Sequence, residues 1–454
     1  MTILQRLGTG GSRLLSLIPH PAMGKWSVAR FKELRHATLS GAKELAPSRL
    51  DVWLALLLAM GVLGFLAIVV GFLQGHEKVF NAELGVPWGI LISTYVFFVV
   101  SASGMCLISS LGHVFGVGRF HLLGRRAVFL AIITLFAGFV AIGAELERPW
   151  RMLIYVGLSP NLSSAIWWMG ALYGLELIFL IAELFFLSRV EIAIRSRESS
   201  GLAAWFYRVL ALGSLDTSEE ALRKNMRFAR LVGIGGVLAA IAATSILGGV
   251  FGLLGAKSSW YGPYMPIYLI LSAFVSGAAI LALVTLLNYR LTRMEMSSEV
   301  KGLLIDLGRL LLLFLGILLF ILVVNTIVGL YGNIPGKSEA LMLLVSGPLS
   351  LPFWGLEVVL GMLVPLFILL NPRTQTVSGV GLASLLVVIG LFAARYDLVI
   401  AGQLVPVVGG AETLSYIPSY TEALIVAGVF AFCAFLYTLG ERVLPLGESG
   451  SRHD

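Results

Sequence analysis

Ten long apolar stretches constrain the fold of this chain more than any other feature. They cover roughly 52–74, 88–116, 124–144, 165–188, 228–255, 263–288, 307–331, 348–371, 376–394 and 421–441. Most exceed the about 20 residues that a helix needs to cross the hydrocarbon core of a bilayer. Because backbone groups in lipid must bond internally, each stretch is a helix or a barrel strand, and the lengths favour helices. The sequence predicts an all-α integral membrane protein with ten transmembrane helices.

Composition and charge set the expected orientation. The chain is 58% hydrophobic and only 13% charged, whereas an average soluble domain is about 25% charged. With the N-terminus inside, 26 of the 32 Lys and Arg residues fall on the cytoplasmic side, and the outer loop 75–87 holds only Lys78. This bias predicts that both termini are cytoplasmic. The net charge of +7 then reflects contact with anionic membrane lipid, and no nucleic-acid partner is expected.

Two halves of the chain share a pattern that predicts a parallel repeat. The second and sixth stretches align at an offset of 173 residues, which matches Gly89 with Gly262, Tyr95 with Tyr268, and Gly104 with Gly277. The fourth and eighth stretches share an aromatic-Gly-Leu-Glu core that ends at Glu176 and at Glu357. Stretches that lie four positions apart run in the same direction, so the repeat is parallel. Small residues such as Gly104, Gly138 and Gly277 would allow close helix packing.

The repeat predicts two parallel-repeat four-helix bundles with one flanking helix at each end of the chain. The expected divisions are a basic cytoplasmic segment (1–51), a first transmembrane helix with an outer loop (52–87), a first four-helix bundle (88–255, with a cytoplasmic loop at 189–227), a second four-helix bundle (256–394), an outer loop with the last transmembrane helix (395–445) and a cytoplasmic tail (446–454).

Carboxyl groups inside the apolar stretches are the first candidate functional residues. Glu176 falls near the middle of its stretch, and Glu183 follows seven residues later on the same helical face, about 10 Å further along the axis. Charged groups at this depth are costly and commonly mark ion or proton pathways. We expect a proton relay, with a structural buried hydrogen bond as the alternative. Glu357 has no second acid toward the cytoplasm, which favours a structural or degenerate role.

Polar residues along the second stretch form a stripe that could continue the relay. Tyr95, Cys106, Ser109 and His113 recur at helical spacing, and Ser103 and Ser110 lie beside them. A stripe of hydroxyls that ends in a histidine fits a proton path. The alternatives are that the serines hold helices together and that His113 is an interfacial histidine. The predicted path comprises Glu176, Glu183, His113, Ser103, Ser109 and Ser110.

A second polar centre lies at the predicted outer rim. Aromatic residues such as Trp88 gather there, as expected for the interfacial belt of a membrane protein. The belt does not explain the titratable residues on the same side, among them His76, Glu145 and Arg148. This mixture suits either the head group of an amphiphile or a docked partner.

The order of several motifs resembles a known family. The run Gly85-Val86-Pro87-Trp88-Gly89, then Tyr95-Val96-Phe97-Phe98, Ser103-Gly104 and Glu145-Leu146-Glu147-Arg148-Pro149, resembles the NrfD/PsrC family of polysulfide reductase membrane subunits. The later Phe353-Trp354-Gly355-Leu356-Glu357 and Arg395-Tyr396 are similar to its ten-helix branch. The resemblance covers roughly 52–445. The family's usual Asp-Leu-Gly-Arg-Pro carries Glu145 and Glu147 here in place of its aspartate and glycine.

The resemblance implies a quinone-reactive membrane subunit of a respiratory oxidoreductase in the prokaryotic inner membrane. It implies an exchangeable quinone or menaquinone, without haem or an iron–sulfur cluster in this chain. Its partners would be a periplasmic ferredoxin-like iron–sulfur subunit and further catalytic or cytochrome subunits, and proton translocation is a further expectation. The implied quinone site comprises Tyr95, Trp88 and Tyr173, with His76, Glu145 and Arg148 at the rim; Tyr268 and Glu357 are the second-bundle equivalents.

Two other classes of membrane protein can be weighed from the sequence. A di-haem cytochrome b needs facing histidines inside the membrane, whereas the six histidines fall in tails, outside, or near the cytoplasmic face: His20, His36, His76, His113, His121 and His453. Cys106 and Cys433 lie inside apolar stretches, so neither a metal site nor a disulfide is expected. An ion- or proton-coupled secondary transporter stays open, because repeats and buried acids also fit that class.

Overall fold

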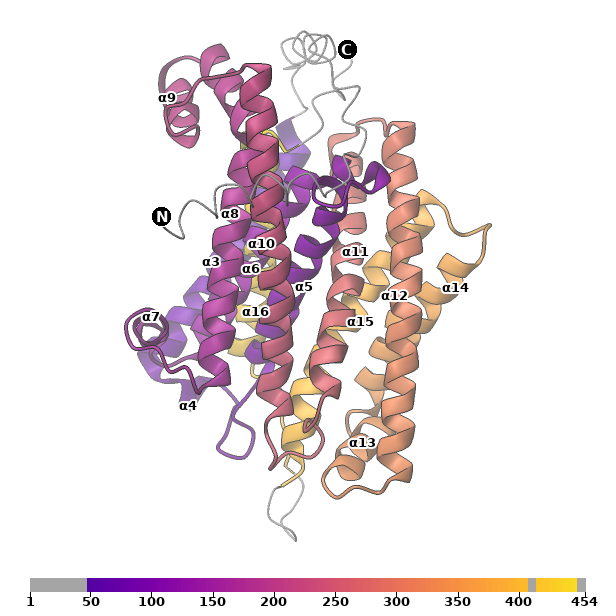
Figure 1. Cartoon of the computed structure of the whole chain (residues 1–454). Helices are drawn as coiled ribbons and strands as arrows, with labels where there is room; N and C mark the ends of the chain where they lie inside the picture. Colours follow the sequence, from indigo (N-terminus) through magenta and orange to yellow (C-terminus); the bar gives the residue numbers. More distant parts are fainter. Residues whose placement is uncertain (1–46, 407–413, 447–454) are drawn as a thin grey trace, which may run out of the picture. The chain divides into compact units, whose positions relative to one another are not determined.

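A computed structural model of the protein describes residues 47–406 and 414–446, all within one compact unit. The regular secondary structure of the described residues is helical, apart from one isolated β-bridge between Glu83 and Val86 (Figure 1). Nearly all of the predicted basic segment and of the C-terminal tail lies outside these residues. The prediction of an all-α integral membrane protein is confirmed.

The helices follow the apolar stretches closely. In chain order they are α3 (Pro47–Gln74), α4 (His76–Val79), α5 (Ile90–His113), η1 (Gly118–Leu122), α6 (Gly124–Glu145), α7 (Pro149–Gly157), α8 (Ala165–Glu198), α9 (Gly201–Leu210), α10 (Glu219–Gly252), α11 (Tyr264–Thr292), α12 (Ser298–Tyr331), α13 (Lys337–Val345), η2 (Leu351–Leu363), α14 (Val364–Leu370), α15 (Val377–Leu404) and α16 (Tyr420–Val443).

Nine membrane-crossing helices are found within the described ranges by length and apolar character, with η2 and α14 together counted as one. The 34-residue helix α8, which carries Glu176 and Glu183, is not among the nine. It nevertheless packs along α10 in the same bundle. The count of ten and the cytoplasmic position of both termini therefore stay predictions.

The helices pack in two groups that meet at α5 and α11. In the first group α5 contacts α6, α6 contacts α8, α8 contacts α10, and α10 closes the ring on α5. The second group forms a ring in the same order, which consists of α11, α12, η2 with α14, and α15. Helices α3 and α16 pack against each other and join the first group through α6. Of the candidate spans, α5 is the most buried, which places it at the centre.

The two groups are held together by a close crossing of α5 and α11. A methyl group on Gly104 would overlap the backbone of Ala273, and one on Gly277 would overlap the backbone of Gly104. Two helices approach this closely only where neither carries a side chain at the contact. The predicted packing role of these two glycines is confirmed.

Several helices begin at a side chain that caps their first turn. The hydroxyl oxygens of Ser164, Ser218, Ser297 and Thr376 each accept a bond from a backbone N–H of the helix that follows. Ser419 forms a full capping box with Glu422. Such caps satisfy orphan N–H groups and fix where each helix starts.

Four helices extend beyond the apolar stretches that predicted them. Helix α8 continues to Glu198, and α10 and α12 begin at Glu219 and Ser298. The predicted cytoplasmic loop 189–227 is accordingly helical over much of its length and includes α9. Helix α15 runs to Leu404, so the predicted outer loop does not begin at 395. Hydropathy marks the thickness of the lipid, whereas a helix continues until its backbone is capped.

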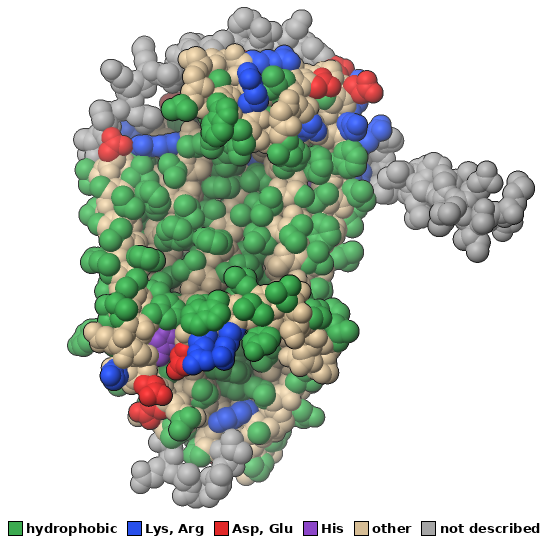
Figure 2. Space-filling view, turned by 90° about the vertical axis from the view of Figure 1, so that its left-hand side faces the viewer, with side chains coloured by type: hydrophobic (Ala, Val, Ile, Leu, Met, Phe, Trp, Pro, Cys, Tyr) green, Lys and Arg blue, Asp and Glu red, His purple; other side chains and the backbone are tan. Residues whose placement is uncertain are grey.

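The surface reflects a membrane environment. Figure 2 shows a broad band of hydrophobic side chains between two more polar ends, one of which displays several Lys and Arg side chains. Large apolar side chains on α3 and α12 are exposed, including Leu56, Phe65, Phe320 and Val328. In a lipid environment such surfaces face acyl chains and not water.

Candidate functional site

The first bundle encloses a carboxyl group near its middle. Glu176 of α8 is fully buried, and the hydroxyl of Ser103 on α5 donates a 2.9 Å hydrogen bond to its Oε2 atom. The other oxygen, Oε1, has no hydrogen-bond partner among the described residues. The structure thus brings together two members of the predicted proton path across the diagonal of the bundle.

Hydroxyl groups lie next to this carboxyl group. Tyr173 precedes Glu176 by about one turn of α8, and its hydroxyl lies beside that of Thr244 on α10. Tyr95 and Arg395 are near enough to act on Tyr173 electrostatically. Both tyrosines are buried, with exposed fractions of 4% for Tyr95 and 0% for Tyr173. Two of the three aromatic residues predicted for the quinone site are therefore neighbours.

A second acid lies toward the other end of the same bundle. His113 Nε2 lies 2.6 Å from Oε1 of Glu183, and both side chains are almost completely buried. Gly233 of α10 packs on the imidazole, and Gly236 packs beside the Glu183 carboxyl group and Cys106. The glycines leave the space that this buried pair occupies.

Two serines of the predicted path have a local role. The hydroxyl groups of Ser109 and Ser110 both donate to the backbone carbonyl of Cys106, at 3.0 and 2.9 Å. Bonds of this kind satisfy a hydroxyl within its own helix. The structure therefore does not bring these serines into hydrogen-bond contact with Glu176 or Glu183.

The predicted outer rim contains a separate polar cluster. Glu422 is fully buried and accepts a 2.6 Å hydrogen bond from the Tyr416 hydroxyl and bonds from the backbone N–H groups of Asn81 and Ser419. Glu145 lies near Glu422 and the backbone of Gly89. The interactions of Glu422 fasten the end of α16 to the loop that precedes α5.

His76 and Arg148 lie on the outer part of this cluster. The imidazole of His76 stacks on Phe80 at 4.6 Å and lies beside the backbone of Glu145. Burial lowers the pKa of His76 below its usual value of 6.5, an effect that nearby Glu147 opposes. Arg148 is exposed at the start of α7. The structure thus joins His76 with Glu145 and leaves Arg148 at the surface.

Trp88 packs toward the second bundle. Its ring stacks on Trp260 at 5.5 Å and meets Phe251 edge-on. Gln403 of α15 bonds both the backbone N–H and the carbonyl of Trp88, each at 2.9 Å. These bonds fix the backbone at the entry to α5.

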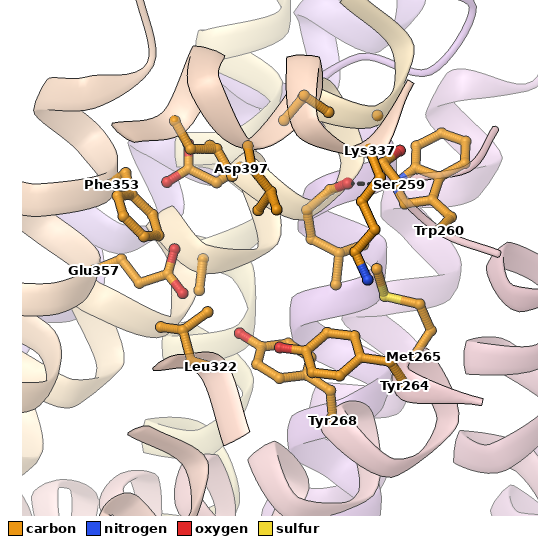
Figure 3. A pocket seen from close by; sticks show the side chains of 17 residues that line it. Ser259, Trp260, Tyr264, Met265, Tyr268, Leu322, Lys337, Phe353, Glu357 and Asp397 are labelled. Atoms are coloured by element: carbon orange, nitrogen blue, oxygen red, sulfur yellow. Dashed lines mark hydrogen bonds between the residues drawn. The ribbon is translucent and has the colours of Figure 1, made fainter. Parts of the chain in front are cut away.

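A pocket that is partly open to the surroundings lies in the second bundle. Figure 3 shows Phe353, Glu357 and Asp397 on one side, the rings of Tyr264 and Tyr268 along another, and Trp260 and Lys337 opposite. The two tyrosine rings stack at 5.5 Å. Both second-bundle equivalents proposed from the repeat, Tyr268 and Glu357, line this pocket.

Buried charges surround the pocket. The carboxyl groups of Glu357 and Asp397 are neighbours, and Asp397 is only 2% exposed. The guanidinium of Arg395, 1% exposed, donates a 2.5 Å bond to Ser272 and lies 5.5 Å from the centre of the Tyr268 ring. Since Arg395 also neighbours Tyr173, it lies between the polar centres of the two bundles.

Sequence reasoning does not single out Asp397 or Lys337. Asp397 follows the predicted end of its apolar stretch, where a charged residue is expected at the surface, but α15 continues beyond that position and buries it. Thr244 was overlooked because single threonines are common in membrane helices. The signal for Asp397 was the close spacing of charges in Arg395-Tyr396-Asp397 after an apolar run.

These features define a class: a helical membrane protein whose bundles enclose carboxyl, hydroxyl and imidazole groups. Among the residues that can be described, no group of three or more His, Cys, Asp or Glu side chains has an arrangement that could hold a metal ion. The family described as polysulphide reductase, NrfD, matches residues 78–407. The chain belongs to the NrfD family, and the resemblance inferred from its motifs is confirmed.

Similar proteins are named as subunits of reductases and of an oxidoreductase. A selenate reductase subunit of Mesobacillus selenatarsenatis is 28% identical over 375 residues, covering 79% of this chain and 86% of that protein. The Hdr-like menaquinol oxidoreductase integral membrane subunit of Archaeoglobus fulgidus is 25% identical over 409 residues, covering 86% and 92%. A putative dimethyl sulfoxide reductase membrane subunit of Halobacterium salinarum is 26% identical over 435 residues, covering 91% and 94%.

Proposed function

We propose that this protein is the quinone-reactive membrane subunit of a respiratory oxidoreductase in a prokaryotic inner membrane. It exchanges electrons between the quinone pool and an iron–sulfur subunit bound at its outer face. The observation that carries the proposal is the buried polar chain in the first bundle, from Tyr95 and Tyr173 through Glu176 to Glu183 and His113. The menaquinol oxidoreductase relative supports the choice of ligand.

The chemistry of this chain of residues fits a quinol. A bound quinol supplies two electrons and two protons, and the electrons leave to a cluster in the partner subunit. The hydroxyl groups of Tyr95 and Tyr173 are suited to bind the oxygens of the head group. Glu176, with one oxygen unpaired within the described part of the chain, is placed to receive a proton one helical turn away.

The remaining residues continue the path toward the predicted cytoplasmic end. Glu183 lies seven residues beyond Glu176, about 10 Å along the axis of α8, so transfer between them needs intervening water. Cys106 lies near both acids. His113 then connects Glu183 to the end of α5. Proton translocation along this path is the extension of the proposal.

Replacing one tyrosine hydroxyl tests the proposed head-group site. Tyr95→Phe removes a hydroxyl but keeps the buried ring, so the complex should assemble normally. Quinol turnover should fall by about tenfold, the value expected when one hydrogen bond of about 1.4 kcal/mol is lost. Tyr155→Phe, which alters an exposed ring on α7, is the matched control. Unchanged quinol kinetics in Tyr95→Phe would show that the head group binds elsewhere.

Purification of the intact assembly tests the partner and separates this proposal from a transporter. Solubilised in mild detergent, the protein should co-purify with an iron–sulfur subunit whose clusters become reduced when quinol is added. A stable assembly of this chain alone, together with uptake of an ion or solute in vesicles, would favour the secondary transporter.

A further inference from the structure

The pocket in the second bundle has features that neither the first-bundle path nor a structural role requires. Glu357 lies on η2, a π-helical segment of 13 residues. π-helical turns are rare and are frequent at functional sites. The segment presents Glu357 to a partly open pocket and not to a sealed helix contact.

One acid in the pocket lacks an ordinary partner. Asp397 is almost completely buried, and no donor group of the residues described bonds either of its carboxyl oxygens. Its neighbour is the carboxyl group of Glu357. Two carboxyl groups placed together away from water repel each other when both are charged, and the neighbouring guanidinium of Arg395 offsets part of that repulsion at Glu357. A ligand with hydroxyl groups could bond such a pair as both donor and acceptor.

The other walls of the pocket define the shape of its ligand. Tyr264, Phe353 and Trp260 provide flat aromatic surfaces, and Leu322, Leu341 and Leu344 provide an apolar surface. Leu322 is half-buried and is followed on α12 by Val323 and Val324, which are 45% and 42% exposed. The apolar wall therefore adjoins the surface of α12 that faces lipid, where a hydrocarbon tail can enter.

We propose that this pocket is a second binding site, distinct from that of the first bundle, for an amphiphile with a hydroxylated aromatic head group of the quinol class. Glu357 and Asp397 bond the hydroxyl groups, the aromatic residues enclose the ring, and the tail leaves along α12. The site itself is inferred from the pocket, and only the choice of quinol as ligand rests on the proposed function.

The charges of the pocket oppose the main competing ligand. A phospholipid head group brings a negative phosphate, which two acidic side chains repel. The amine of Lys337 donates a 3.0 Å bond to Asn325, and burial lowers the pKa of Lys337. The amine is thus engaged by a neutral side chain and is a weaker partner for phosphate than an exposed lysine.

Counting bound ligand tests the proposal without measuring turnover. The intact complex, freed of quinone and placed in phosphatidylglycerol-containing nanodiscs, is titrated with the fluorescent quinol analogue 2-heptyl-4-hydroxyquinoline N-oxide. We expect two equivalents per chain. Glu357→Gln combined with Asp397→Asn should weaken one equivalent by about tenfold or more, whereas Tyr95→Phe should weaken the other.

A second variant separates loss of the site from loss of folding. Ala340→Phe narrows the pocket from α13 without changing an acid and should also remove one equivalent while the complex remains assembled. If each chain binds one equivalent of the analogue and none of the pocket variants weakens that binding, the proposal of a second site is wrong. If phosphatidylglycerol competes with the analogue and prevents the second equivalent from binding, the pocket binds a phospholipid and the proposed quinol-class ligand is wrong. Failure of the proposed function appears separately, as normal quinol turnover in Tyr95→Phe.

Discussion

Glu176 and Glu357 occupy matching positions in the two bundles, yet their surroundings differ. Glu176 lies on a regular α-helix, is sealed from solvent and accepts a bond from Ser103 on the diagonal helix. Glu357 lies on a π-helical segment and lines a pocket beside the carboxyl group of Asp397. The same short motif therefore supports two different polar centres, because the residues opposite the carboxyl group decide what it can do.

The neighbouring helices explain the difference. In the first bundle α10 contributes glycines, Gly233 and Gly236, beside the Glu183–His113 pair. In the second bundle α15 contributes charged residues, Arg395 and Asp397, next to Glu357. Burying an acid without a nearby cation or hydrogen-bond donor costs free energy. Glu176 accepts a hydrogen bond from Ser103, whereas Glu357 lies next to the cation Arg395.

The crossing of α5 and α11 joins the two centres, and disrupting it should have the largest effect. Gly104→Val places a branched side chain against the backbone of Ala273, which no change of rotamer can relieve. The expected cost exceeds the about 1–3 kcal/mol usual for an overpacked core, so little folded protein should be recovered by size-exclusion chromatography. Gly249→Ala on α10, where a methyl group has open space, is the control. Normal recovery of the valine variant would contradict the close crossing.

The Glu183–His113 pair should be the next most sensitive feature, and the second bundle has no counterpart to it among the residues that the structure describes. His113→Leu leaves the buried Glu183 carboxyl group beside an apolar side chain. Removing one partner of a buried pair costs about 3–5 kcal/mol, so the melting temperature should fall clearly. His113→Gln keeps a polar partner and should lose less stability. Equal melting temperatures for the leucine and glutamine variants would show that the contact contributes nothing specific.

His76 at the rim should give the smallest effect, one that depends on pH. Burial lowers the pKa of His76 in the folded protein below 6.5, so the unfolded chain binds more protons over that interval. Folding stability should therefore decline as the pH falls below about 6.5. In His76→Gln this part of the decline should disappear, as measured by thermal unfolding between pH 5 and 8. A decline of the same size in His76→Gln would assign it to other groups.

Much of the fold could be predicted from the sequence because lipid imposes simple rules on it. Apolar length located the helices, and small residues such as Gly104 and Gly277 indicated positions where helices can pack closely. Helical spacing placed Ser103 and His113 on one stretch and Glu176 and Glu183 on another along one predicted path, but it did not predict which of them would pair. These inferences needed only the pitch of a helix and the cost of a buried polar group.

The second pocket could not be predicted in the same way. Its acids come from η2 and α15, and their proximity depends on a π-helical distortion that no local motif announces. Asp397 lies beyond the predicted apolar stretch, so hydropathy assigned it to an outer loop. Conversely, Ser109 and Ser110 had the right spacing for the path but bond their own helix. Spacing places residues on a face, whereas tertiary packing decides their partners.

The contrast between the two acids is tested most directly by replacing each one alone and measuring quinol turnover by the intact complex. Glu176→Gln and Glu357→Gln both keep the size and polarity of the side chain but cannot carry a proton. Glu176→Gln should slow turnover by roughly a hundredfold, the contribution typical of a positioned proton acceptor, while Glu357→Gln leaves most of it. Full activity in Glu176→Gln together with inactivity in Glu357→Gln would contradict the assignment of quinol chemistry to the first bundle.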